Sequence, residues 1–220
     1  PESALLRSEK GRRTFASSNN GTQASQGNDD SNTRNSNNKQ IIFIAMSKHV
    51  LLIGATGFVG SAILNELLSR GHQVTAVARH PEKMAAHPAL TAVAADVENV
   101  DRIAELAKGK DAVISAYNPG WTNPDQPRLI AQNNPLILEA VRRSGVKRVL
   151  IVGGAGTLFC APGLRVVDAG VIPDEILAAV REVGNFHLNV VEKERDLDWA
   201  YFCPAGEIAP GERTGKFRLG

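Results

Sequence analysis

The sequence predicts an α/β fold in which helices cover both faces of a doubly wound parallel sheet. From residue 49 onward, short apolar runs alternate with longer segments of helical periodicity, the pattern of a parallel sheet covered by helices. A turn with three glycines joins the first apolar run to the first helical segment. With 220 residues, 43% of them hydrophobic, the chain can bury one core of ordinary size.

The first three elements form a βαβ unit. Residues 49–55 read as a buried strand, residues 59–71 as a helix that Gly71 ends, and residues 72–79 as a second strand. Five apolar side chains of the helix recur at helical spacing and share one face: Val59, Ile63, Leu64, Leu67 and Leu68.

The alternation continues to a fifth strand. Pro135 is expected to kink or divide the long helix that precedes this strand. The elements, in order, are a short helix or loop over 81–88, a strand over 90–96, a helix over 100–109, a strand over 111–117, a helix over 128–145 and a strand over 146–154.

The last part of the chain is less regular. Residues 161–173 read as a long connection of the kind that carries substrate contacts. Residues 173–195 read as a helix, interrupted at Gly184, and residues 198–203 as a sixth strand.

Residues 1–45 differ in composition from the rest. They are rich in Ser, Asn, Gln and Gly and cannot bury enough apolar surface to offset their ordering entropy, so we expect a disordered leader or tail. Met46 is a natural start immediately before the first strand, and residues 46–220 then form the folded domain. A transit peptide is the alternative, supported by Arg7 and nearby arginines but opposed by the acidic residues of the same segment.

Composition excludes several classes of partner. The net charge is only +2 and the basic residues do not cluster, so no nucleic-acid footprint is visible. The apolar run at residues 41–46 is far shorter than a membrane span, and Cys160 and Cys203 lack the spacing of a metal or redox site. We therefore expect a reduced, cytoplasmic protein without a metal, acting as a monomer or homodimer.

The glycine-rich turn has the features of a dinucleotide-binding turn. It lies where the first strand ends and the first helix begins. Gly54 permits the tight turn, Gly57 allows backbone amides to approach a pyrophosphate, and Gly60 lets the helix lie close to the sheet. The phosphate would also gain the dipole of the helix amino terminus.

Arg79 is the residue that predicts which dinucleotide, NAD or NADP, the site prefers. An acidic residue near the end of the second strand would bind the ribose 2′-hydroxyl of NAD, whereas an arginine there accommodates the 2′-phosphate of NADP. This chain has Arg79 and no carboxylate at that place, which predicts a preference for NADP(H) over NAD(H). A merely solvated arginine is the alternative.

The string GATGFVG at residues 54–60 resembles the turn of the extended and atypical short-chain dehydrogenases, whose fold is of the Rossmann type. The resemblance implies that Asp96 reaches the adenine, although a turn or helix cap is an equally good interpretation of that residue. The resemblance also places Ser115, Ala116 and Tyr117 against the ribose that carries the nicotinamide. It places Pro204 near the carboxamide group of the nicotinamide ring. The implied cofactor-binding residues are Gly54, Thr56, Gly57, Phe58, Val59, Gly60, Arg79, Asp96, Val97, Ser115, Ala116, Tyr117, Gly153, Gly154 and Pro204.

The usual proton-transfer residues of that group are missing. The fifth strand ends in VGGAG in place of the usual serine, and neither Tyr117 nor Tyr201 is followed by a lysine at the fourth position. The C-terminal pattern DWxxxxPAxxxxPGxRTGxxRLG resembles the bacterial NADH-flavin reductases, the Rrf2-linked type, and the resemblance covers residues 47–220. That family continues for a further helix, so we expect this chain to be truncated at its C-terminus.

The resemblance implies an NAD(P)H-dependent oxidoreductase that passes a hydride to a small-molecule acceptor, a flavin or a quinone-like compound, without a Ser-Tyr-Lys triad. Tyr117 and His187 are the catalytic candidates, with Asn118 as a further polar residue, although each also suits a structural role. Two alternatives stay open: a non-catalytic NADP-sensing regulator similar to NmrA-like proteins, and a sugar-nucleotide epimerase or dehydratase.

Overall fold

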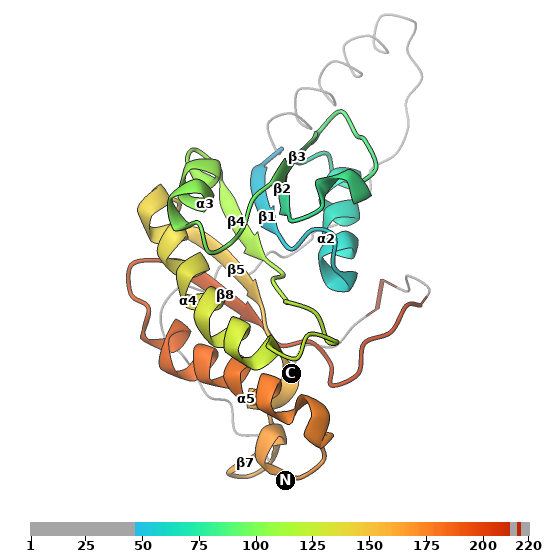
Figure 1. The fold of residues 1–220 in the computed structure, drawn as a ribbon, viewed down its shortest axis with the longest axis vertical. Helices are drawn as coiled ribbons and strands as arrows, with labels where there is room; N and C mark the ends of the chain where they lie inside the picture. The colour runs from blue at the N-terminus through green and yellow to red at the C-terminus, as the bar shows by residue number, and fades with distance from the viewer. Residues whose placement is uncertain (1–46, 212–214, 217–220) are drawn as a thin grey trace, which may run out of the picture. The chain divides into compact units, whose positions relative to one another are not determined.

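The computed structural model describes residues 47–211, 215 and 216. The predicted leader over residues 1–45 lies outside the described residues. Six strands form one parallel sheet in the order β3-β2-β1-β4-β5-β8 (Figure 1). The strands are β1 (His49–Ile53), β2 (Gln73–Ala78), β3 (Leu90–Ala94), β4 (Ala112–Ser115), β5 (Arg148–Val152) and β8 (Asp198–Phe202). The predicted doubly wound parallel sheet is therefore confirmed.

Four helices connect the strands. They are α2 (Phe58–Ser69), α3 (Val100–Ala107), α4 (Gln126–Ser144) and α5 (Asp174–Asn189). Short 3-10 turns lie between them: η1 (Pro81–Lys83), η2 (Ala155–Thr157), η3 (Val166–Asp168) and η4 (Val191–Lys193). The segment 81–88, for which a short helix or a loop was expected, contains only the single turn η1.

Two apolar clusters hold the helices against opposite faces of the sheet (Figure 1). The larger cluster joins buried residues of α3, α4 and α5 to alternate residues of the strands, for example Leu51, Val113 and Val149. The smaller cluster packs Leu64 of α2 against Leu52 and the other strand residues of that face. Helices therefore cover both faces, as the alternation of apolar runs predicts.

Helix α4 is continuous across Pro135, so of the two predicted outcomes, a kink or a division, the division is wrong. Residues on both sides of it, including Ile130 and Leu138, are buried, and their packing stabilises the helix although proline removes one helical hydrogen bond. The expected interruption of α5 at Gly184 is also wrong. A Cβ at Gly184 would lie 3.2 Å from Cγ2 of Thr157, so this glycine allows a close approach inside the helix.

The predicted long connection contains structure that its sequence does not reveal. Strands β6 (Phe159–Ala161) and β7 (Leu164–Arg165) form a small antiparallel hairpin, and η3 follows directly. The side chains of Leu158, Phe159 and Leu164 are exposed. Strands of three and two residues with no buried side chain leave no alternating pattern for sequence reasoning to detect.

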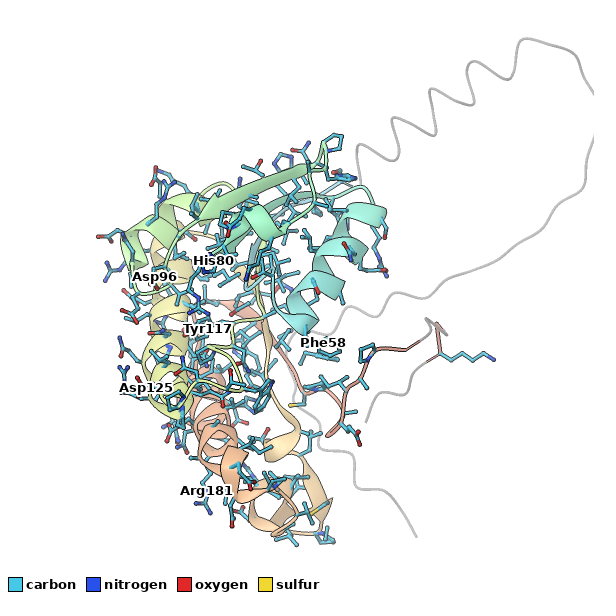
Figure 2. All side chains as sticks on the ribbon, turned by 45° about the vertical axis from the view of Figure 1, so that its right-hand side comes forward. Phe58, His80, Asp96, Tyr117, Asp125 and Arg181 are labelled. Atoms are coloured by element: carbon cyan, nitrogen blue, oxygen red, sulfur yellow. The ribbon has the colours of Figure 1, made fainter. Side chains whose placement is uncertain are left out.

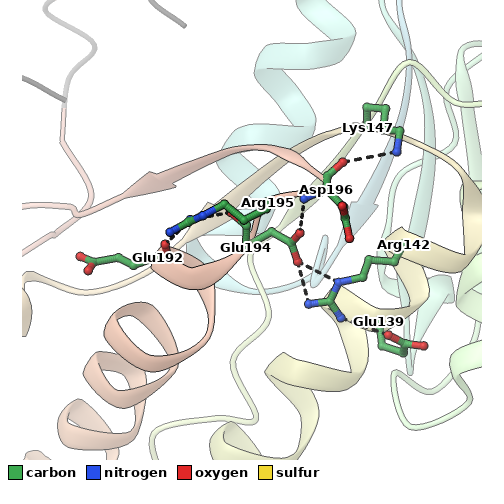
Figure 3. A network of polar contacts seen from close by, with 7 residues as sticks. All are labelled: Glu139, Arg142, Lys147, Glu192, Glu194, Arg195 and Asp196. Carbon is green, nitrogen blue, oxygen red and sulfur yellow. Dashed lines mark hydrogen bonds and ion pairs between the residues drawn. The ribbon is translucent and has the colours of Figure 1, made fainter. Parts of the chain in front are cut away.

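A polar network joins α4 to the segment before β8 (Figure 3). The Glu194 side chain is only 3% exposed, and Nη2 of Arg142 lies 2.7 Å from its Oε2. The backbone N–H of Asp196 donates to Glu194 Oε1 over 2.6 Å. Burial works to raise the pKa of Glu194, but the Asp196 amide and Arg142 outweigh it and lower that pKa.

Within the part of the chain that the structure describes, no helix is both long enough and apolar enough to cross a lipid bilayer.

Candidate dinucleotide and acceptor site

The glycine-rich turn lies at the point where the strand order reverses, between β1 and β4. Gly54 has a φ of 81°, and a Cβ at this residue would lie 2.5 Å from the carbonyl oxygen of Ala116. The turn and the end of β4 are thus in contact because residue 54 has no side chain. Crevices at such reversal points, outside the carboxyl ends of the strands, are where open α/β sheets bind ligands.

The amino terminus of α2 is left without a side-chain cap. Gly57 occupies the N-cap position, no side chain there accepts a hydrogen bond from the helix, and the first turn holds no acidic residue. Thr56, Gly57 and Phe58 are exposed, Val59 is half-buried and Gly60 is buried. A Cβ at Gly60 would collide with the carbonyl oxygen of Gly54, so this glycine is required for the helix to leave the turn at this angle.

Arg79 and Asp96 follow the ends of β2 and β3, and both are exposed. No hydrogen bond or ion pair joins Arg79 to another of the described residues. By contrast, Arg102, Arg128 and Arg143 each pair with a carboxylate. Asp96 Oδ1 accepts a hydrogen bond of 3.0 Å from the backbone N–H of Glu98, which is the turn role left open from the sequence.

Tyr117 follows β4 and forms a hydrogen bond with a buried residue of α4. Asn133 is 2% exposed, and its Nδ2 donates to the Tyr117 hydroxyl over 2.7 Å. Asn133 Oδ1 is buried and has no partner among the described residues. Burial raises the pKa of Tyr117, against the opposing effects of Asn133 and Arg79, so the phenol is neutral near pH 7. Figure 2 shows Tyr117 and Asp96 on the same side of the molecule.

His187 belongs to a second group of polar side chains, at the ends of β5 and β8. Its Nδ1 lies 3.2 Å from Thr157 Oγ1, and Thr157 Oγ1 lies 3.8 Å from Cys203 Sγ. The His187 ring is stacked in parallel on Tyr201, with the centroids 3.9 Å apart. Burial lowers the pKa of His187, and a weaker attraction from Glu192 does not reverse the shift, so the imidazole is neutral near pH 7.

The two catalytic candidates therefore belong to different groups of contacts. Tyr117 interacts with Asn133 and lies near enough to Arg79, Asp96 and Glu98 for their charges to affect its pKa. His187 interacts with Thr157 and Tyr201. Asn118 accepts hydrogen bonds from the Gly120 amide and the Gln126 side chain, so it organises the loop before α4.

The other predicted residues also lie at or next to the carboxyl edge of the sheet. Ser115 is the last residue of β4 and is buried; Ala116 and Pro204 are half-buried. Val97 is 7% exposed and its side chain belongs to the larger apolar cluster, so only its backbone could face a ligand. A Cβ at Gly153 would collide with the Tyr201 ring, and one at Gly154 would lie 3.5 Å from Val183. The Tyr201 ring thus accounts for a glycine at position 153, because a larger residue there would collide with it.

Sequence reasoning missed Asn133, Thr157, Tyr201 and Cys203 as members of these groups. One signal was available: Ile130, Asn133 and Ile137 recur at helical spacing, so Asn133 is a polar residue on an apolar face. The contact between Thr157 and His187 joins segments 30 residues apart, and no local pattern announces it. Among the described residues, no group of three His, Cys, Asp or Glu side chains could hold a metal ion.

The residues at the first strand-to-helix turn fit the pyrophosphate of a nicotinamide dinucleotide. The uncapped amides of α2 are hydrogen-bond donors without a competing carboxylate, and a helix amino terminus favours negative charge. The free guanidinium of Arg79 at the end of β2 fits a 2′-phosphate.

The comparisons with known proteins agree with this geometry. A family model described as NAD(P)H-binding matches residues 54–219. The uncharacterized protein YwnB of Bacillus subtilis is 31% identical over 172 residues, which cover 77% of this chain and 78% of YwnB. The UDP-glucose 4-epimerase of Mycolicibacterium smegmatis is 28% identical, and the match covers 73% of this chain but only 56% of the epimerase.

Two crystal structures are similar over most of their length. One, from Bacteroides thetaiotaomicron and named a "putative epimerase", is 48% identical with a TM-score of 0.72; the match covers 78% of this chain and 77% of that one. The other, from Streptococcus pneumoniae and named a "putative NADH-flavin reductase", is 28% identical with a TM-score of 0.62; the match covers 77% and 78% of the two chains. The resemblance inferred from the sequence is thus confirmed, and the chain belongs to the NAD(P)H-binding family of Rossmann-fold proteins.

Proposed function

We propose that this protein is an NADPH-dependent reductase that transfers a hydride to a flavin or a quinone-like acceptor without a Ser-Tyr-Lys triad. The observation that carries the proposal is the pairing of an uncapped α2 amino terminus with a free arginine at the end of β2, in a chain that has no Tyr-x-x-x-Lys sequence. The similarity to a protein named as an NADH-flavin reductase supports the same reaction class.

The residues of the turn bind and orient the dinucleotide in this proposal. The amides of Phe58, Val59 and Gly60 hold the pyrophosphate, with Thr56 beside it; the Gly57 amide donates to the Gly54 carbonyl oxygen and closes the turn. Arg79 holds the 2′-phosphate, for which a hydrogen bond to a charged group contributes about 1.5–3 kcal/mol, or roughly a 10- to 100-fold preference for NADP over NAD. Asp96 and Val97 lie at the adenine end and Ser115, Ala116, Gly153, Gly154 and Pro204 at the nicotinamide end.

The acceptor is inferred from the protonation states of the candidate acids. Bound NADPH supplies the hydride. Tyr117 and His187 are both neutral near pH 7, since burial raises the pKa of the phenol and lowers that of the imidazole. Neutral groups orient an acceptor by hydrogen bonds but are weak proton donors, which suits a flavin or quinone that takes its proton from water.

The same absence of a catalytic tyrosine and lysine disfavours a sugar-nucleotide epimerase or dehydratase. Trp121 follows Tyr117 at the fourth position and Ala205 follows Tyr201, so neither tyrosine has the lysine partner. We place the protein in the cytoplasm as a monomer or homodimer, with no nucleic acid or membrane as partner. The free thiols of Cys160 and Cys203 are consistent with a reducing compartment.

The test is NADPH oxidation by the full chain with menadione, riboflavin or FMN as acceptor, followed by the loss of absorbance at the nicotinamide band. We expect turnover with at least one of the three and a lower KM for NADPH than for NADH. Tight NADP binding with no acceptor reduced would contradict a reductase and support an NADP sensor instead.

A further inference from the structure

Trp121 is the most exposed of the described Phe, Trp and Tyr residues, at 63%. Tryptophan is highly buried on average in folded proteins. The other tryptophan, Trp199, follows this tendency, since it is half-buried and packs against the larger apolar cluster. No hydrogen bond or ring contact joins the Trp121 side chain to another described residue. Its indole ring is therefore free to contact a ligand.

Trp121 belongs to the loop between β4 and α4, at the carboxyl edge of the sheet. The loop begins at Ala116, whose carbonyl oxygen would lie 2.5 Å from a Cβ at Gly54, so its first residue touches the glycine-rich turn. Figure 1 shows this loop at the same end of the sheet as the amino terminus of α2. Five residues of chain reach at most about 18 Å. Trp121 thus lies within that distance of the strand end at which the proposed function places the nicotinamide.

Hydrogen bonds hold the loop that carries Trp121. Asn118 Oδ1 accepts from the Gly120 amide over 2.8 Å and from Gln126 Nε2 over 3.2 Å. Gln126 is only 4% exposed, so a buried polar side chain binds the loop to α4. The Asn123 amide donates to the Gly120 carbonyl oxygen over 3.2 Å, which closes a turn with Trp121 at its second position. These bonds fix the backbone from which the indole projects.

A second exposed ring lies at the same end of the sheet. Phe58, the first residue of α2, is 56% exposed. Phe58 and Trp121 follow β1 and β4, the two neighbouring strands between which the strand order reverses. Exposed apolar rings close to the uncapped amides of α2 match the composition of a small-molecule site, which is mostly apolar with a few polar groups.

The loop offers apolar contact and no free charge. Its one charged residue is Asp125, and Oδ2 of this residue lies 3.3 Å from Nη2 of Arg128. The indole of Trp121 is itself neutral, with a single N–H donor. A flat, uncharged aromatic surface favours a ligand that is also flat and uncharged, because two such rings gain from offset stacking beyond the apolar area that they bury.

We infer that Trp121 contacts the hydride acceptor, and that its indole stacks on a neutral, planar, conjugated ring of that acceptor. Trp121 is then a specificity-determining residue that selects flavins and quinones over acceptors without a flat ring. This inference rests on the proposed function, whose acceptor it describes.

The test is titration of riboflavin with the full chain kept saturated with NADP⁺, followed by the quenching of riboflavin emission that stacking on an indole causes. Trp121→Leu keeps an apolar side chain but removes the ring, and we expect it to weaken riboflavin binding about 5- to 20-fold. Trp121→Phe keeps a ring and should stay within about threefold of the wild type. The side chain is exposed, so neither change disturbs the core.

Trp199→Phe is the matched control. It removes the half-buried tryptophan of the larger cluster and should leave both the riboflavin affinity and the quenching as in the wild type. Quenching that disappears in Trp199→Phe and persists in Trp121→Leu would assign the stacking to the wrong tryptophan and overturn the inference.

Equal riboflavin affinity in the wild type and Trp121→Leu would also overturn it, as would a loss in Trp121→Phe as large as that in Trp121→Leu. Menadione reduction by NADPH with the same kcat/KM in the wild type and Trp121→Leu would overturn the inference and leave the proposed reductase standing. A wild type that stacks riboflavin on Trp121 yet oxidises no NADPH with any acceptor would contradict the reductase and support the site. The two failures are therefore distinguishable.

Discussion

The amino and carboxyl ends of the sheet strands, here called the amino edge and the carboxyl edge, differ in how fully their polar groups are paired. At the amino edge, ion pairs link the end of α4 to the segment before β8: Glu194 is buried and saturated by Arg142 and the Asp196 amide. At the carboxyl edge, the uncapped amides of α2, the free Arg79 and the neutral Tyr117 and His187 have hydrogen-bonding capacity left over.

This difference indicates that the carboxyl edge binds ligands and that the amino edge stabilises the fold. A carboxylate that is fully paired inside the protein has nothing left to offer a ligand, whereas donors without protein partners acquire them from a ligand or from water. Asn133 Oδ1, buried and without a partner among the described residues, belongs to the carboxyl edge too. Changes at the amino edge should therefore alter stability alone, and changes at the carboxyl edge should alter binding.

Gly54→Ala should have the largest effect at the carboxyl edge. Alanine at a φ of 81° is strained, and its Cβ would lie 2.5 Å from the Ala116 carbonyl oxygen, so the turn must move. We expect NADP⁺ affinity to fall more than about 100-fold, since both the amides and the helix direction change. Isothermal titration calorimetry of the variant with NADP⁺ measures this loss of affinity.

Gly109→Ala is the matched control. Gly109 has a φ of 74°, but a Cβ there would meet nothing within 4 Å. It should lose about 1–2 kcal/mol of unfolding free energy from backbone strain and keep the NADP⁺ affinity of the wild type. Equal affinities for Gly54→Ala and Gly109→Ala would show that the turn does not bind the dinucleotide.

Glu194→Gln should have the largest effect at the amino edge. It removes the buried charged partner of Arg142 and leaves that side chain paired with Glu139 alone, and we expect a loss of about 2–4 kcal/mol of unfolding free energy, measured by urea denaturation, with NADP⁺ affinity unchanged. Asp198→Asn removes the exposed ion pair with Arg148 and should cost at most about 1 kcal/mol. Weakened NADP⁺ binding in Glu194→Gln would contradict the division between the edges.

The stabilising effect of Glu194 should also depend on pH. Its pKa is lower in the folded protein, so the carboxylate contributes its full stability above the ordinary glutamate pKa of about 4.3 and loses it as the pH falls through the folded-state value. The gap in unfolding free energy between the wild type and Glu194→Gln should narrow below about pH 4. A gap that stays constant to pH 3 would refute this assignment.

Arg79→Gln should separate the two dinucleotides. We expect a 10- to 100-fold loss of NADP⁺ affinity and less than a twofold change for NAD⁺, because only NADP⁺ carries the 2′-phosphate. Arg181→Gln is the control, since the Arg181 side chain is also exposed and forms no ion pair or hydrogen bond with the described residues, but lies on α5 (Figure 2). Equal losses for both dinucleotides in Arg79→Gln would point to a general charge effect.

Of the substitutions at the carboxyl edge, Tyr117→Phe should have the smallest effect on NADP⁺ affinity. It removes the hydroxyl that pairs with Asn133 and leaves a second polar atom of that buried amide without a partner. We expect a loss of about 1–2 kcal/mol of unfolding free energy and less than a threefold change in NADP⁺ affinity. A kcat for menadione reduction lowered more than 100-fold, with stability unchanged, would instead make Tyr117 a catalytic residue.

The sequence predicts the sheet and the glycine turn because both depend on local patterns. The apolar runs 49–55 and 72–79 and the glycines between them are adjacent in the chain, and so is the helix that joins them. Pro135 and Gly184 misled the prediction because tertiary packing keeps α4 and α5 continuous through residues that weaken an isolated helix. The contacts of Thr157 with His187 and of Tyr117 with Asn133 depend on how α4 and α5 lie on the sheet, which no local pattern specifies.

Titration of the wild-type chain with NADP⁺ and, separately, with NAD⁺ by isothermal titration calorimetry tests the central claim most directly. The account predicts that both bind, with NADP⁺ about 10- to 100-fold tighter. Failure of both dinucleotides to bind at millimolar concentration, by a protein whose circular dichroism shows it to be folded, would contradict the assignment of the glycine turn as a dinucleotide site.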